Sequence, residues 1–272
     1  MRREESVRRE ESVRREEEVI RLAGAVQRRV RDARPPPLAA PQLAGLPRAR
    51  LEAMGAAGRE ILECYRVLRK CGLNVVGELL RGQGGFREYD HYPRDDVVDA
   101  DSHAHYYYHA HRGLAGEHGH FHTFLRASGM PPGALPALAA HSEPWPEGEQ
   151  AIAHLIAISM DAYGYPIGLF APNRWVAGDT WYPADELIGM LDRFRIDHAY
   201  PSWPVNRWIG AMLVLFRPHI ELLLLARDQV IGAWRDAFPG ADAWERRDLE
   251  ILSHLPVSVD DTIAEVGAAL AV

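Results

Sequence analysis

The chain has 272 residues, enough for one large domain or two small ones. Apolar residues make up 47% and charged residues 25%, the balance of an ordinary soluble globular protein. The net charge of -7 argues against a nucleic-acid-binding protein, which needs a basic face. We therefore expect no nucleic-acid partner.

No segment predicts export or membrane insertion. The N-terminus opens Arg-Arg-Glu-Glu, without the apolar stretch of a signal peptide. The most apolar run, residues 208–226, is interrupted by Arg217 and Pro218, so it predicts a buried helix pair and no membrane span. Cys64 and Cys71 lie seven positions apart in a predicted helix, roughly 10 Å between Cα atoms. A disulfide needs less than about 7 Å, so we expect free thiols and a cytoplasmic location.

The N-terminal segment differs in character from the rest. Residues 2–19 repeat a six-residue unit, Arg-Arg-Glu-Glu-Ser-Val, in which Glu precedes Arg by four positions. That spacing supports a solvated helix, but valines every six residues give no coiled-coil seam. We interpret residues 1–34 as a charged appendage, helical or disordered, and residues 35–50 as a proline-rich linker. Residues 51–272 are then expected to form a single α+β domain.

The domain is predicted to contain N-terminal helices, two β-hairpins and C-terminal helices, in that order. Apolar residues recur at three and four over 51–80, which predicts a helix broken near Gly72. Residues 104–112 and 117–125 predict one β-hairpin, and residues 153–160 and 166–170 a second. Further helices are expected over 183–194, from Pro204 with a break at Pro218, over 241–254, and from a Ser258 cap onward. The fold class is therefore α+β: a small antiparallel sheet of two hairpins, about 104–171, between N-terminal helices and a helical half, about 183–272.

Histidines gather on the first hairpin. Residues 91–122 hold eight of the thirteen histidines. Side chains alternate faces along a strand, and a symmetric turn at 114–115 pairs residues whose numbers sum to 229. Arg112 then faces Glu117 as an ion pair, while His111 meets His118, His109 meets His120, and Tyr107 meets His122. A slip of one residue would disperse the imidazoles to opposite faces.

Clustered imidazoles point to a divalent transition metal, with zinc or iron the best fit. Zn²⁺ accepts imidazole nitrogen at about 2.0–2.1 Å, and three such ligands leave a position for water or substrate. Neighbouring imidazoles without a cation must each find hydrogen-bond partners, and protonated ones repel. His154, at the start of the third predicted strand, joins these ligands if that strand lies beside the hairpin and turns His154 to the same face. The candidate metal ligands are His109, His111, His118, His120, His122 and His154.

Other interpretations remain open at this point. If residues 103–112 were helical, His105 and His109 would form an i, i+4 ligand pair. The cluster can also be a patch of hydrogen-bonded imidazoles without an ion. Glu117 is a candidate catalytic carboxylate beside the site, although the register turns it toward Arg112. Tyr107 is a candidate donor to a substrate, and its alternative role is packing.

The motif Tyr-Tyr-Tyr-His-Ala-His-Arg (106–112) with Glu-His-Gly-His-Phe-His-Thr-Phe (117–124) resembles the signature of an uncharacterised bacterial protein family. The resemblance covers about residues 50–265 and implies no activity. The ligand spacing is also similar to zinc sites of carbonic anhydrases and to cupin sites, by analogy of spacing only.

Three functional hypotheses follow. The first is a mononuclear metalloenzyme, hydrolytic or oxidative, acting on a small-molecule substrate through metal-bound water or O₂. The second is a metal carrier or sensor without catalysis. The third is a helical interaction module whose histidines are structural or pH-responsive.

Overall fold

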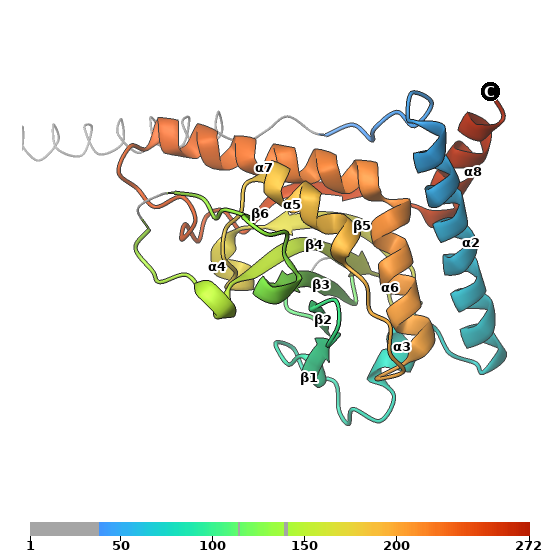
Figure 1. Cartoon of the computed structure of the whole chain (residues 1–272). Helices are drawn as coiled ribbons and strands as arrows, with labels where there is room; N and C mark the ends of the chain where they lie inside the picture. Colours follow the sequence, from blue (N-terminus) through green and yellow to red (C-terminus); the bar gives the residue numbers. More distant parts are fainter. Residues whose placement is uncertain (1–37, 114, 139–140) are drawn as a thin grey trace, which may run out of the picture.

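The computed structural model describes residues 38–113, 115–138 and 141–272. It has the expected α+β fold, with a six-stranded antiparallel sheet (Figure 1). Along the chain, helices precede the first strand, separate the fifth strand from the sixth, and follow the last. The charged appendage predicted for residues 1–34 lies outside the described residues. Of the expected linker, residues 48–50 already belong to the first described helix.

The helical prediction for residues 51–80 is confirmed, including its break. Helix α2 spans Arg48–Lys70 and α3 spans Val75–Leu80. Gly72 has φ +70°, a conformation that favours glycine, and ends the first helix. Asn74 then caps the second helix, because its Oδ1 accepts a hydrogen bond from Gly77 N at 2.7 Å.

The sheet is larger than the two hairpins expected. Its six strands lie in chain order, β1 (Tyr92–Val98), β2 (Ala104–His109), β3 (Gly119–Arg126), β4 (Ile152–Met160), β5 (Pro166–Pro172) and β6 (Ile251–Pro256). The predicted hairpins are β2–β3 and β4–β5, and an unexpected strand extends each edge. Strand β1 is irregular, with a register shift between Tyr92 and Val97, and Pro93 interrupts the usual strand pattern.

The C-terminal half is helical except for one strand. Its helices are α4 (Arg174–Ala177), α5 (Ala184–Met190), α6 (Trp203–Leu215), α7 (Arg217–Ala237) and α8 (Val259–Leu270), with a 3₁₀ turn at Leu191–Arg193. Two further 3₁₀ turns, Ala127–Gly129 and Gly148–Gln150, lie between β3 and β4. Ser258 caps α8 as expected, accepting from Asp261 N at 3.3 Å. The helix predicted over 241–254 is wrong, because residues 251–256 pair with β5 instead.

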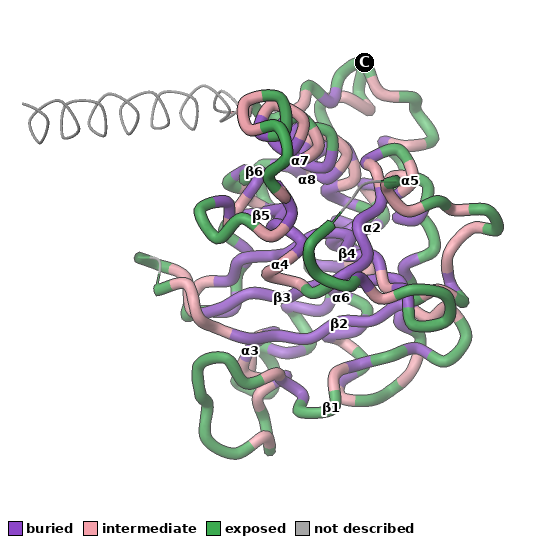
Figure 2. The backbone as a smooth tube through the Cα atoms, turned by 90° about the vertical axis from the view of Figure 1, so that its left-hand side faces the viewer, coloured by how far each residue is buried: buried purple, intermediate pink, exposed green. Residues whose placement is uncertain are grey.

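The helices cover one face of the sheet, with α7 running over it and α2, α6 and α8 grouped at one end (Figure 1). The Tyr106 hydroxyl on β2 donates to Asn206 Oδ1 of α6 at 2.6 Å, and the Phe121 ring on β3 lies 5.6 Å from Trp208. Strand alternation therefore turns His105, Tyr107 and His109 toward the opposite face. That face is buried too, since β2, β3 and β4 are covered along their lengths (Figure 2).

The two cysteines and the most apolar helices were also the subject of expectations from the sequence. Cys64 is buried and Cys71 exposed, and both are free thiols, as predicted. No single helix in the described ranges combines the length and apolar character needed to cross a membrane. Helices α6 and α7 meet that criterion only when taken together, and they are bent by 70° relative to one another.

Candidate metal centre

The predicted hairpin register is confirmed. In the β2–β3 ladder Tyr107 lies opposite His122 and His109 lies opposite His120. Beyond the paired residues Arg112 Nη1 reaches Glu117 Oε2 at 3.1 Å, the expected ion pair. The strand interpretation of residues 104–109 therefore replaces the helical alternative.

Three histidines come close enough to share one ion. One ligand nitrogen from each of His109, His111 and His120 lies within 4.8 Å of the other two. The ring centroids are 4.6–5.1 Å apart, and the rings meet at 71–81° instead of stacking. His109 and His120 are buried, whereas His111 is partly exposed. The structure thus holds a histidine triad that could accommodate a metal ion.

Two of these rings each bury a nitrogen that has no hydrogen-bond partner among the described residues. His120 Nδ1 lies 2.8 Å from Glu117 Oε1, the geometry in which a neutral imidazole donates to a carboxylate and keeps a lone pair on Nε2. His120 Nε2 and His109 Nε2 are buried, with no hydrogen-bond partner in the described part of the chain. A carboxylate behind an imidazole fixes its tautomer and orientation, an arrangement common at metal centres.

A fourth imidazole borders the triad. The His122 ring lies 4.9 Å from both His109 and His120, measured between centroids. Its Nδ1 is 2.8 Å from His154 Nε2, while its Nε2 is another buried nitrogen without a partner among the described residues. The predicted ligand His154 therefore contacts the cluster through His122, and strand β4 is adjacent to β3 as expected.

His118 lies elsewhere, contrary to its expected pairing with His111. Its Nδ1 is 2.7 Å from the Tyr108 hydroxyl, and its ring packs against Phe86. The alternation breaks before β3 begins, because the turn contains Gly113 and Gly116 with φ of +58° and +88°. Strict period-two reasoning therefore fails for the residue just outside the strand.

Of the two candidate catalytic residues, Glu117 differs from expectation in its direction, whereas Tyr107 lies opposite His122 as expected. Glu117 is not turned away from the histidines, since its two oxygens divide between His120 and Arg112. Tyr107 is packed, with its ring stacked on His91 at 3.7 Å between centroids. His91 in turn shares Asp96 with His105, each at 2.9 Å.

Electrostatics keep the imidazoles neutral. Burial, together with the neighbouring His120 and His111, lowers the pKa of His109 to about 2. Burial also lowers the pKa of His120, against the hydrogen bond to Glu117, and that of His122 falls well below its ordinary value. Burial raises the pKa of Glu117, but the hydrogen bond to His120 and the charges of His120 and Arg112 together outweigh it, so this pKa is lowered. A neutral imidazole beside an ionised carboxylate is the state that binds a metal.

Two of the three triad histidines face a cleft of about 510 Å³. His109 and His111 form part of its wall, together with other residues of the hairpin and residues from three further segments of the chain. These residues are Tyr89, His91, Tyr107, Arg112, Trp175, Val176, Arg247 and Glu250. Sequence reasoning did not single out Arg247 or Glu250, which lie more than 120 positions from the hairpin, and no local pattern marks them.

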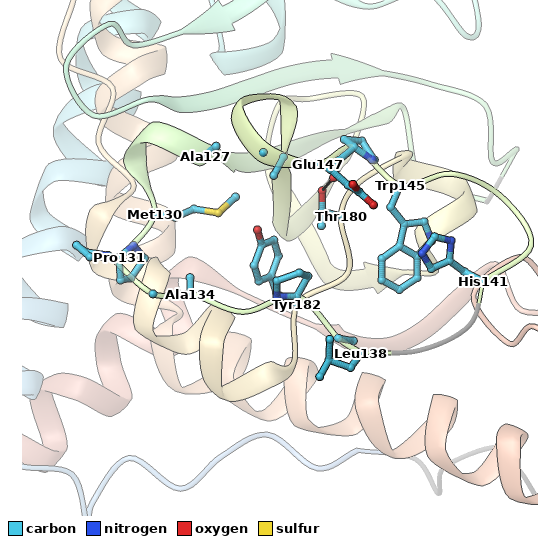
Figure 3. Close-up of a pocket in the computed structure, with 17 residues that line it drawn as sticks. Ala127, Met130, Pro131, Ala134, Leu138, His141, Trp145, Glu147, Thr180 and Tyr182 are labelled. Carbon is cyan, nitrogen blue, oxygen red and sulfur yellow. Dashed lines mark hydrogen bonds between the residues drawn. The ribbon is translucent and has the colours of Figure 1, made fainter.

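A larger cavity of about 670 Å³ lies away from the histidines (Figure 3). Trp145 and His141 stack at one end of it, with ring centroids 4.3 Å apart, and Met130 and Tyr182 line another part. None of the clustered histidines lines this cavity. We place the candidate chemistry at the smaller cleft, because convergent titratable groups identify a site better than volume does.

Comparison with known proteins identifies a family and no activity. The family model described as a domain of unknown function, DUF6969, matches residues 55–257. No curated protein matches the chain. No solved structure matches it either.

Proposed function

The chain belongs to the DUF6969 family, and we propose that it is a mononuclear metalloprotein whose ion is held by His109, His111 and His120. The observation that carries the proposal is the pair of buried Nε2 atoms of His109 and His120, beside His111, that have no hydrogen-bond partner among the described residues. Nitrogens bound to one tetrahedral ion lie ~3.4 Å apart, so small side-chain rotations would close the site.

The energetic argument favours an ion over an empty cluster. A buried polar atom without a partner costs about 1–3 kcal/mol. Protonation offers no relief, because burial holds the pKa of His109 at about 2. A divalent cation accepts the free lone pairs and removes the cost. Binding therefore stabilises the arrangement that the chain already adopts.

The donor set favours zinc, with iron second. Three imidazoles form the first coordination shell of catalytic zinc in one well-known arrangement, whereas two histidines and a carboxylate mark many Fe²⁺ oxygenases. The nearest carboxylate, Glu117, is already engaged by Arg112 and His120. Three neutral ligands also leave the ion's charge unreduced, which strengthens its action as a Lewis acid.

We infer hydrolytic chemistry on a small molecule as the function of this centre. The cleft reaches His109 and His111, so one side of the ion would face substrate. A zinc ion in such a site lowers the pKa of bound water to about 7 and polarises a carbonyl or phosphoryl oxygen. Glu117 would keep His120 oriented, and Tyr107 would form part of the substrate wall.

Thermal unfolding with and without metal tests this proposal. Excess Zn²⁺, Co²⁺ or Fe²⁺ should raise the melting temperature of tag-free protein, because a ligand that binds only the native state stabilises it. His109→Ala combined with His120→Ala should abolish the shift. His219→Ala is the matched control, since His219 is buried on α7 outside the cluster. An unshifted wild-type protein would remove the metal centre.

A carrier without catalysis is the second candidate, and His122 is the observation that favours it. Its buried Nε2 has no partner in the described residues and lies next to the triad, so it can supply a fourth imidazole and close the coordination shell. Hydrolysis of the activated ester 4-nitrophenyl acetate by zinc-loaded protein separates the two. Turnover that needs zinc and survives in His122→Ala supports the enzyme; none in either protein supports the carrier.

A further inference from the structure

The cleft beside the triad carries chemistry that a metal site alone does not require. Arg247 lies on the segment before β6, with its guanidinium carbon 4.3 Å from the centroid of the Trp175 ring. Stacking of this kind fixes the guanidinium plane and leaves its N–H edges free. Within the described ranges Arg247 has no ion pair or hydrogen bond.

Arg112 lines the same cleft and adds a second guanidinium to it. It stacks over Phe170 at 4.1 Å, and its Nη1 is used by Glu117 and by Ser159. The cleft contains one carboxylate of its own, Glu250. With a divalent ion bound by neutral imidazoles, the cleft keeps a net positive charge despite Glu250.

The mouth of the cleft is aromatic and strained. Tyr89 is 71% exposed and has φ +68°, a backbone conformation that non-glycine residues seldom adopt. Its N–H donates to Ala110 O at 2.9 Å, and its ring stacks on His111 at 5.6 Å between centroids and 19° between planes. Strain that the surroundings maintain at a cleft is a mark of a binding surface.

We propose that this cleft binds a small aromatic carboxylate. Its carboxylate group would contact both Arg247 and the metal ion, and its ring would lie between Tyr89 and Trp175. The proposal names the substrate class of the centre and rests on the proposed function for its metal contact. The carboxylate matches the free guanidinium edges, since Arg binds carboxylates through paired hydrogen bonds. The flat rings at the mouth match a planar body, and a cleft of about 510 Å³ suits a small metabolite.

Benzoate, acetate and benzamide test the proposal as probes. Each is titrated into Co²⁺-loaded protein, followed by the visible absorption of the ion, and into metal-free protein, followed by calorimetry. Benzoate should bind about tenfold more tightly than benzamide, which lacks the charge, and more tightly than acetate, which lacks the ring. In the metal-free protein the same order should hold at lower affinity.

Two variants with matched controls assign the contacts. Arg247→Gln should weaken benzoate binding about tenfold, whereas Arg246→Gln should not, because Arg246 pairs with Asp248 and lies near Trp234. Tyr89→Gly should weaken benzoate while leaving acetate unchanged. Glycine adopts the positive φ without strain, so misfolding does not explain such a loss.

The two proposals fail in different ways. If Co²⁺ is not retained, the metal function fails, and the metal-free titrations still decide the fate of the carboxylate site. If Co²⁺ is retained but benzamide binds as well as benzoate, or Arg247→Gln changes nothing, the carboxylate inference is overturned and the metal centre stands.

Discussion

Both faces of the β2–β3 hairpin are buried, but they differ in the kind of polar atom that lacks a partner among the described residues. On the helix side the Tyr106 hydroxyl has a partner in Asn206, and Phe121 packs against Trp208. On the other side His109, His120 and His122 each bury a nitrogen with no partner in the described chain. Burial by itself therefore does not distinguish core from site. Clustered imidazole nitrogens do, because each can offer a lone pair to a cation, whereas the buried Trp208 Nε1 on the helix side, which also lacks a partner in the described chain, can only donate.

The largest expected effect lies on the helix side. Phe121→Ala removes a fully buried ring and should lower the free energy of unfolding by about 3–5 kcal/mol, measured by urea denaturation. The protein that remains folded should bind metal as before. Loss of metal binding by fully folded Phe121→Ala would mean that the two faces are not separable.

The histidine side should respond in the opposite direction. His109→Leu replaces a buried imidazole with an unpartnered nitrogen by an apolar side chain, so metal-free protein should gain stability, by up to about 1–3 kcal/mol. Metal binding should disappear. A metal-free variant much less stable than the wild type would show that this ring is structural, contrary to our account.

Glu117 provides a graded test of the same face. Glu117→Gln keeps the size of the side chain but weakens the contact that orients His120, and we expect metal affinity to fall about 10–100-fold in a competition titration. Glu245→Gln is the control, because Glu245 pairs with Arg174 away from the cluster. Equal effects of both substitutions would assign Glu117 a general role in stability.

The pH dependence of metal-free protein gives the smallest effect per residue. The folded pKa values of His109 and His154, about 2 and about 3, lie below the ordinary value of 6.5, so the unfolded chain binds more protons at intermediate pH. Stability should therefore be fully present above pH 6.5 and fall as pH drops toward 3. Between pH 7.5 and 5.5 each such histidine contributes about 1.4 kcal/mol.

Paired urea titrations of wild type and His109→Leu at those two pH values isolate one histidine. The variant should lose less stability on acidification by about that amount. Identical pH dependence in both proteins would indicate that the ring is protonated when folded.

The sequence predicted the part of the site that depends on strand periodicity. The facing pairs His109–His120 and Tyr107–His122 follow from alternation together with one charge pair, Arg112–Glu117. Alternation ceases where the turn glycines take positive φ, which is why His118 was misplaced and Glu117 was assigned the wrong direction.

The parts that sequence did not predict depend on contacts between distant segments. Strand β6 is six residues long and is defined by its pairing with β5, about 80 positions earlier, so its local pattern was mistaken for a helix. Arg247 and Glu250 enter the cleft because β6 closes the sheet beside β5. Nothing within their own stretch of chain indicates that neighbourhood.

Counting the metal bound per chain tests the central claim most directly. Tag-free protein is dialysed against Zn²⁺, then against metal-free buffer, and analysed by mass spectrometry beside His120→Ala and His219→Ala. We expect one zinc per chain in the wild type and in His219→Ala, and none in His120→Ala. Zinc absent from the wild type, or retained equally by His120→Ala, would contradict the account.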